Sequence, residues 1–231
     1  MTQYENEVKK RDVMCCMNAG NQGCGRKWSR MRIITDTGTD ILDKEAKKLG
    51  IELVAIRSNF TDTVFSENTE AEFTRFYDKL RQTDTLPVSS QPSPAEFLEL
   101  FEDAKEKQEE VVVITISSKL SGTYNGAMLA KDMAEYDNIY VVDSLLASLS
   151  ERLLVEYAVK LRDAGMGAKE LVRKLEQDRE RVILTGVPST LLYLKMGGRI
   201  SPVVAAVGGV IGIKPVLWLK DGVIESRSKA R

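Results

Sequence analysis

Two patterns of apolar and polar positions alternate along the chain from residue 31 onward. Short runs of Ile, Val and Leu have the length of buried strands, and they occupy 32–35, 51–56, 111–116, 139–142, 182–187, 213–219 and 222–224. Stretches with apolar residues three and four positions apart have the pattern of helices, and they occupy 41–49, 69–81, 120–136, 145–162, 169–181 and 190–195. This alternation predicts an α/β fold with a parallel sheet, flanking helices and right-handed crossovers.

Local signals sharpen several of these elements. Gly50 ends the first helix. Ser93-Pro94-Ala95-Glu96 is a capping box with proline at the first helical position, so another helix begins there. The continuous apolar run 111–116 predicts a central strand covered on both faces. The last two strands form a hairpin around Lys220-Asp221, and Pro215 favours an edge position for the first of them.

Three polar segments follow predicted strands: Asp36, Ser117–Thr123 and Asp143-Ser144. In a parallel sheet the carboxyl ends of the strands share one edge, where ligands bind. We therefore expect these segments to gather at one edge of the sheet.

The pattern divides the chain into three parts. Residues 1–30 lack periodicity, and we expect a disordered extension ahead of a natural start at Met31. Residues 31–162 are predicted to form the main α/β domain. Residues 163–231 begin a second α/β domain that we expect to be incomplete at Arg231.

Composition excludes several classes of function. A net charge of −1 does not favour nucleic acid or an anionic membrane surface. The longest apolar run, 203–213, is too short to span a bilayer. All 3 cysteines precede Met31 and the chain has no histidine, so we expect no disulfide framework and no metal site. Free thiols and the lack of an apolar signal core indicate the cytoplasm.

The candidate chemistry lies in three hydroxyl-rich segments that lead into helices: 89–94, 117–123 and 197–201. Hydroxyls and free backbone N–H groups at helix starts bind anions. Neutral donors such as Ser121 and Ser89 or Ser90 hold a carboxylate without neutralising it, which suits a carboxylate that must later react. The alternative is that each serine simply caps its helix.

Other chemistries fit less well. Asp36-Thr37-Gly38-Thr39-Asp40 invites comparison with the aspartyl phosphatases of the haloacid dehalogenase type, but Gly38 stands where their second aspartate would be. We expect Asp36 to anchor the turn and Asp40 to cap the following helix. No P-loop or dinucleotide fingerprint is present, and no histidine is available for a triad. A Ser–Lys pair with Lys119 or Lys195 remains formally open.

Taken together, the motifs resemble the DegV family, the fatty-acid-binding subunits of bacterial fatty acid kinase. The matching segments run in order along the chain: 34–40, 76–77, 90–94, 117–124, 142–144, 193–201 and 213–215. The resemblance implies a two-domain α/β protein that holds one long-chain fatty acid in an apolar tunnel. It performs no chemistry itself and needs no further cofactor, because a separate kinase phosphorylates the bound carboxylate.

The resemblance also implies roles for individual residues. Ser89 and Ser121 would bind the fatty-acid carboxylate. The supporting turn residues would be Ser90, Ser118, Gly122 and Thr123. The partner kinase, the catalytic subunit, would contact Arg199 and Arg231.

The chain departs from the family pattern in places. The family continues past Arg231 and supplies a histidine to the carboxylate from that part, so the resemblance implies truncation. Lys119 replaces a usual glycine, and Ser150-Glu151-Arg152 puts charges where the family is compact and apolar. Two alternatives therefore stay open: an enzyme acting on a small phosphorylated metabolite, and a non-functional truncated paralogue.

Overall fold

A four-stranded parallel sheet forms the centre of the protein. The computed structural model describes residues 31–83, 85–200 and 214–230. The sheet contains β1 (Met31–Asp36), β2 (Glu52–Val54), β6 (Glu110–Thr115) and β7 (Ile139–Asp143), in the order β2-β1-β6-β7. The chain adds β2 on one side of β1 and then β6 and β7 on the other side, so the strand order reverses between β1 and β6. Parallel sheets of this kind bind ligands at such a switch point.

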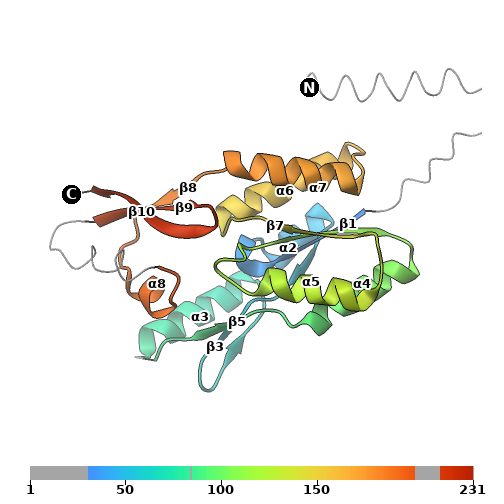
Figure 1. Ribbon diagram of the computed structural model, residues 1–231. Helices are drawn as coiled ribbons and strands as arrows, with labels where there is room; N and C mark the ends of the chain where they lie inside the picture. Colours follow the sequence, from blue (N-terminus) through green and yellow to red (C-terminus); the bar gives the residue numbers. More distant parts are fainter. Residues whose placement is uncertain (1–30, 84, 201–213, 231) are drawn as a thin grey trace, which may run out of the picture.

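Helices cover both faces of this sheet (Figure 1). One face is packed by α2 (Asp43–Leu49), α6 (Leu149–Asp163) and α7 (Ala168–Asp178), and the other by α4 (Pro94–Glu106) and α5 (Thr123–Ala134). Side chains alternate along a strand, so Ile33 packs with Leu154 and Leu171 whereas Ile34 packs with Phe97 and Phe101. The predicted parallel sheet with flanking helices is confirmed.

The core on the face covered by α2, α6 and α7 extends beyond residue 162, where we placed the end of the main domain. Leu171 and Leu175 of α7 are fully buried in the same cluster as Ile33 and Ile114. Leu219, from the last hairpin, joins that cluster as well. One core thus connects the main sheet with residues near the end of the chain.

A small antiparallel sheet lies beside the main one. It has the order β4-β3-β5 and consists of β3 (Arg57–Asn59), β4 (Val64–Phe65) and β5 (Val88–Ser90). The helix α3 (Glu70–Gln82) packs near it, and the rings of Phe60, Phe65 and Phe76 meet at centroid distances of 5.5–5.8 Å. This aromatic cluster joins the helix to the small sheet.

The last part of the chain forms a third sheet, which consists of β8 (Leu184–Gly186), β9 (Lys214–Lys220) and β10 (Val223–Ala230). The short helix α8 (Leu192–Met196) lies between β8 and β9 in the sequence. The β9–β10 turn has positive φ at both Asp221 and Gly222, as a two-residue type I′ hairpin requires. The edge position favoured by Pro215 is wrong, because β9 is the middle strand. Proline is tolerated there because β8 pairs only with Leu217–Leu219 and leaves that end of β9 with one neighbour.

Several predicted boundaries shift for local reasons. The helix predicted over 145–162 begins at Leu149, because Asp143 and Ser144 accept hydrogen bonds from the backbone N–H groups of Leu145 and Leu146 and hold an irregular turn. The strand predicted over 51–56 is shorter in the structure, where only β2 falls within it, and a separate strand, β3, begins directly after it at Arg57. The chain turns tightly after β1 and after α7 through η1 (Thr37–Thr39) and η2 (Arg179–Arg181).

Candidate functional site

Two aspartates organise the carboxyl edge of the main sheet. Asp36, at the end of β1, accepts hydrogen bonds from the backbone N–H groups of Ile116 and Gly38, both at 2.8 Å. Asp143, at the end of β7, accepts from those of Ser118 at 3.1 Å and Leu145 at 3.0 Å. The three polar segments therefore meet at this edge, as predicted.

The turn over residues 117–123 differs from the expected anion cradle. The N–H groups of Leu120 and Ser121 donate to the Ser117 carbonyl, and that of Lys119 donates to the Ser117 hydroxyl. The N–H of Ser118 is held by Asp143. The expected free N–H groups are thus not found from Ser118 to Ser121, and the neutral side-chain donors of these four residues are the hydroxyls of Ser118 and Ser121.

Ser121 is half-buried and is not the N-cap of the helix that follows it, although its hydroxyl accepts a long 3.4 Å hydrogen bond from the N–H of Thr123, the first residue of α5. The N-cap of α5 is Gly122, which makes no side-chain cap hydrogen bond. The Ser121 hydroxyl lies 2.9 Å from that of Thr123, which is fully buried. Its position beside a buried hydroxyl, on a turn at the carboxyl edge, is compatible with ligand binding.

Ser89 and Ser90 lie on β5 rather than in a turn, and both are exposed. Ser89 stands opposite Ser58 of β3, so their side chains share one face of the small sheet. The Ser90 hydroxyl accepts a 3.0 Å hydrogen bond from the Asn59 amide. Capping is therefore not the role of either serine; the cap of α4 is Ser93, as predicted.

The two serine-bearing segments touch through Gln91 and Gly122. A Cβ atom added at Gly122 would clash with the Gln91 Oε1 atom and stand 2.9 Å from its Cδ atom. Gln91 follows Ser89 by two residues and Gly122 follows Ser121 directly. The structure therefore brings the predicted carboxylate-binding segments side by side.

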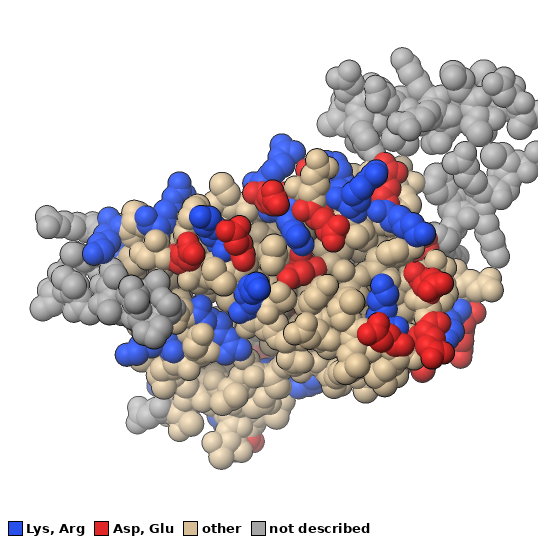
Figure 2. All heavy atoms as spheres, in the orientation of Figure 1, with Lys and Arg blue, Asp and Glu red and all other residues tan. Residues whose placement is uncertain are grey.

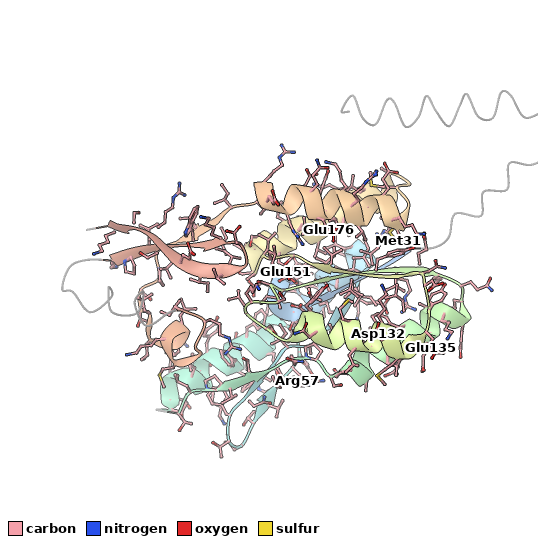
Figure 3. The ribbon with its side chains drawn as sticks, in the orientation of Figure 1. Met31, Arg57, Asp132, Glu135, Glu151 and Glu176 are labelled. Carbon is pink, nitrogen blue, oxygen red and sulfur yellow. The ribbon has the colours of Figure 1, made fainter. Side chains whose placement is uncertain are left out.

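Buried carboxyl groups lie beneath this edge. Figure 3 shows Glu151 at the opposite end of the molecule's main sheet from Met31, near the start of α6. Glu151 is 0% exposed, and neither carboxyl oxygen has a hydrogen-bond partner within the described residues. Burial, reinforced by Asp36, Asp40 and Asp143, raises the pKa of Glu151 well above its usual value. Burial likewise raises the pKa of Asp36 to about 6, against two opposing backbone hydrogen bonds.

The role predicted for Asp40 is wrong. The N-cap of α2 is Leu42, and Asp40 instead accepts a 2.5 Å hydrogen bond from the hydroxyl of Ser148. Asp40 has a positive φ of 58°, which places it in the turn after η1, too early to cap the helix. It thereby ties the loop after β1 to the start of α6.

An apolar cavity of about 360 Å³ lies between the third sheet, α8 and the loop after β7. Its lining residues are Ala147, Leu184, Thr185, Gly186, Val187, Pro188, Leu194, Leu217, Trp218, Leu219 and Ile224. Leu120, next to Ser121, packs against the same core cluster as Leu219 and Ile224. The Ser117 hydroxyl also donates to the carbonyl of Gly222, two residues before Ile224 of the cavity lining, so the cavity lies near the hydroxyl-bearing turn.

A second cavity, of about 330 Å³, lies at the carboxyl ends of β1 and β6. Aromatic residues such as Phe65, Phe73 and Phe76 form one wall, and Gly38 and Ser58 belong to its polar part. Its lining is more polar than that of the first cavity, which makes the first the better match to an acyl chain.

Arg199 lies next to the hydroxyl-bearing turn. Its Nε donates to the Leu120 carbonyl at 3.1 Å and its Nη1 donates to the Gly197 carbonyl. Arg231 and Ser201, which the sequence analysis also singled out, lie outside the described residues.

The described residues carry both signs of charge and contain neither a metal-binding cluster nor a helix suited to span a membrane. Figure 2 shows lysine, arginine, aspartate and glutamate side chains interspersed over the described part of one face. Across 31–83, 85–200 and 214–230, no cluster of three or more His, Cys, Asp or Glu side chains is arranged to hold a metal ion. In the same residues no helix is both long and apolar enough to cross a membrane.

Comparison with known proteins identifies the family. The sequence model described as "Uncharacterised protein, DegV family" matches residues 30–231. A DegV domain-containing protein of Caldanaerobacter subterraneus is 32% identical over 202 residues, covering 87% of this chain and 72% of that protein. Another, of Halalkalibacterium halodurans, is 33% identical over 88% of this chain and 72% of its own length. The chain belongs to the DegV family.

Solved structures of similar proteins include fatty-acid complexes. A fatty-acid-binding DegV family protein of Thermus thermophilus has a TM-score of 0.77 and 32% identity, over 87% of this chain and 72% of that one. A stearic-acid-binding protein of Eubacterium ventriosum has a TM-score of 0.79 at 28% identity, with 87% and 71% covered. The fatty acid kinase B3 protein of Streptococcus pneumoniae, loaded with linoleic acid, has a TM-score of 0.75 at 29% identity, with 87% and 73% covered.

Sequence reasoning missed two features of this edge, namely the complete burial of Glu151 and the contact of Gln91 with Gly122. Glu151 repeats the helical spacing of Leu154, Val155 and Ala158, so the periodicity of α6 already placed a carboxyl group on its buried face. The contact of Gln91 with Gly122 had no such signal, because it joins residues that are distant in the sequence.

Proposed function

We propose that this protein binds a long-chain fatty acid and presents its carboxylate to a separate kinase. The observation that carries the proposal is the apolar cavity near a turn that carries the paired hydroxyls of Ser121 and Thr123. The acyl tail would occupy that cavity, and Ser89 and Ser121 would hold the carboxylate, supported by Ser90, Ser118, Gly122 and Thr123. The fatty acids bound by similar DegV structures support this assignment.

Neutral donors suit presentation to a kinase. Hydroxyl groups stabilise a carboxylate without pairing it with a full charge. The oxygen atoms therefore keep the nucleophilic character that an incoming phosphoryl group requires. The binding protein contributes position, and the kinase contributes the chemistry.

The proposed partner is the catalytic subunit of a fatty acid kinase in the cytoplasm. Arg199 and Arg231 are its proposed contacts, and the similarity to the kinase B3 protein of Streptococcus pneumoniae supports such a partner. Arg199 is exposed and lies beside the turn that carries Ser121, so a protein that reaches the carboxylate would also reach this guanidinium.

The rival, an enzyme acting on a small phosphorylated metabolite, is less well supported. A phosphate group is best held by free backbone N–H groups, and those from Ser118 to Ser121 are engaged within the protein.

Mass spectrometry of the gently purified protein tests the proposal. We expect one fatty acid per chain under native conditions. In the variant Gly186→Leu, the new side chain would lie on the same strand face as Leu217 and fill the cavity, so we expect a folded protein without the acid. A wild-type protein that neither carries nor takes up oleate or palmitate would overturn the proposal.

A further inference from the structure

The side chain of Gln91 lies across the start of α5 on two glycines. At Gly122 a Cβ atom would stand 2.9 Å from the Gln91 Cδ and 3.1 Å from its Nε2, besides the clash with Oε1. At Gly126, one turn later, a Cβ atom would stand 3.6 Å from the same Nε2 and 3.5 Å from the Pro92 carbonyl oxygen. The segment after β5 therefore rests directly on the backbone of α5.

This close approach connects the two halves of the proposed carboxylate site. Ser89 belongs to the small antiparallel sheet, whereas Ser121 belongs to a loop of the main parallel sheet. These sheets do not share a hydrogen-bonded strand pair among the described residues. The separation of the two serine hydroxyls consequently depends on contacts such as that of Gln91 with Gly122.

We propose that Gln91 is a positioning residue: seated on Gly122, it sets the spacing at which Ser89 and Ser121 together engage a ligand carboxylate. The proposal rests on the proposed function and adds the element that aligns the two hydroxyls. It also explains the glycine at position 122, because any larger residue would displace the Gln91 carboxamide from its seat on the start of α5.

A double-mutant cycle tests this role. Gln91→Ala, Gly122→Ala and the double variant are compared with the wild type by calorimetric titration of the delipidated proteins with oleate. Each single variant should lose about two- to tenfold in affinity, the size expected for one neutral hydrogen bond. The double variant should lose no more than one single variant, because the new Cβ atom no longer meets the Gln91 side chain.

Controls separate positioning from other effects. Gln91→Met keeps the length of the side chain and should keep most of the affinity, whereas a direct hydrogen bond from Gln91 to the ligand would be lost. Gln82→Ala, at an exposed glutamine of α3, and Gly167→Ala, where a Cβ atom meets nothing within 4 Å, should leave affinity unchanged. The melting temperatures of all ligand-free variants show whether each remains folded.

Two results would overturn the inference. Additive losses in the double variant would show that Gln91 and Gly122 act independently. Unchanged oleate affinity in Gly122→Ala would show that the contact does not govern the site. A wild-type protein that binds no fatty acid would instead refute the proposed function itself, and the positioning role with it.

Discussion

At the scale of single residues, the hydroxyl groups of the proposed carboxylate site differ in what they do for the fold. Ser121 is paired with the buried hydroxyl of Thr123, so its removal leaves a buried group without a partner. Ser89 is exposed, and the structure gives its hydroxyl no hydrogen-bond partner within the described residues. Removal of the Ser89 hydroxyl should therefore affect ligand affinity alone, whereas removal of the Ser121 hydroxyl should affect both ligand affinity and the stability of the fold.

Ser89→Ala should weaken oleate binding with no loss of stability. A hydrogen bond to a charged carboxylate contributes about 1.5–3 kcal/mol, or about ten- to a hundredfold in affinity. Titration calorimetry and a thermal melt measure the two quantities, with the exposed Ser228→Ala as the matched control. Unchanged affinity in Ser89→Ala would remove Ser89 from the carboxylate site.

Glu151 should make the protein less stable as the pH rises. Its pKa is raised in the folded state, so above about pH 4.5 the unfolded chain releases a proton that the folded protein retains. The contribution of Glu151 to stability is therefore fully present below that pH and is lost as the pH rises to the folded-state pKa. Asp36, with a pKa of about 6, adds a loss of the same sign between about pH 4 and 6.

The variant Glu151→Gln mimics the protonated carboxyl group and tests this sign. Its melting temperature should exceed that of the wild type at pH 8 and approach it near pH 4. Each unit of pKa difference corresponds to about 1.4 kcal/mol, and each kcal/mol to about 2–4 °C in a chain of this size. Glu176→Gln, at an exposed position of α7, is the control and should change neither value. If Glu151→Gln were less stable than the wild type at pH 8, the ionised Glu151 carboxylate would be stabilising the folded protein, and the expected sign would be wrong.

At the scale of elements, the tip of the β9–β10 hairpin is attached to the turn after β6. The Ser117 hydroxyl donates a buried 2.7 Å hydrogen bond to the Gly222 carbonyl. A Cβ atom at Gly222 would stand 2.6 Å from the Ser117 Oγ atom, in a backbone conformation with φ of +83°. This contact holds one wall of the apolar cavity against the turn that carries Ser121.

Ser117→Ala and Gly222→Ala should both release the hairpin. The first leaves a buried carbonyl without its partner, at a cost of about 1–3 kcal/mol. The second adds steric strain to a positive φ. Hydrogen exchange of β9 and β10 should accelerate in both variants, while β1 and β6 keep their protection. Gly167→Ala should change nothing, and equal acceleration in all sheets would show global destabilisation instead.

The sequence predicted more of the elements than of their contacts. Strand runs such as 111–116 and the capping box at Ser93 were predicted because their signals are local. The start of α6 was missed because Asp143 and Ser144 compete for the backbone N–H groups that precede it. At the candidate site, the roles of the serines remain predictions from motifs. The contacts of Gln91 with Gly122 and of Ser117 with Gly222 could not be predicted, because they join residues far apart in the chain and carry no local signal.

At the scale of the whole molecule, one core links the main sheet to the third sheet. Leu219 of β9 belongs to the same buried cluster as Ile33, Ile114 and Leu154. Ser117 adds a polar connection between the same two parts. Because neither part buries this surface without the other, we expect them to unfold together.

A chain that begins at Met31 tests that expectation, because it lacks Trp28 and keeps Trp218 of β9 as its single tryptophan. The motivation for removing residues 1–30 is their lack of periodicity and the family match from residue 30. We expect this shorter chain to keep the melting temperature and oleate affinity of the full chain. Its denaturant unfolding, followed by Trp218 fluorescence and by far-ultraviolet circular dichroism, should give coincident transitions, because Trp218 reports the third sheet while dichroism reports mainly the helices around the main one. An earlier fluorescence transition would show that the third sheet melts alone, and the apolar cavity would then lack a stable wall until a ligand fills it.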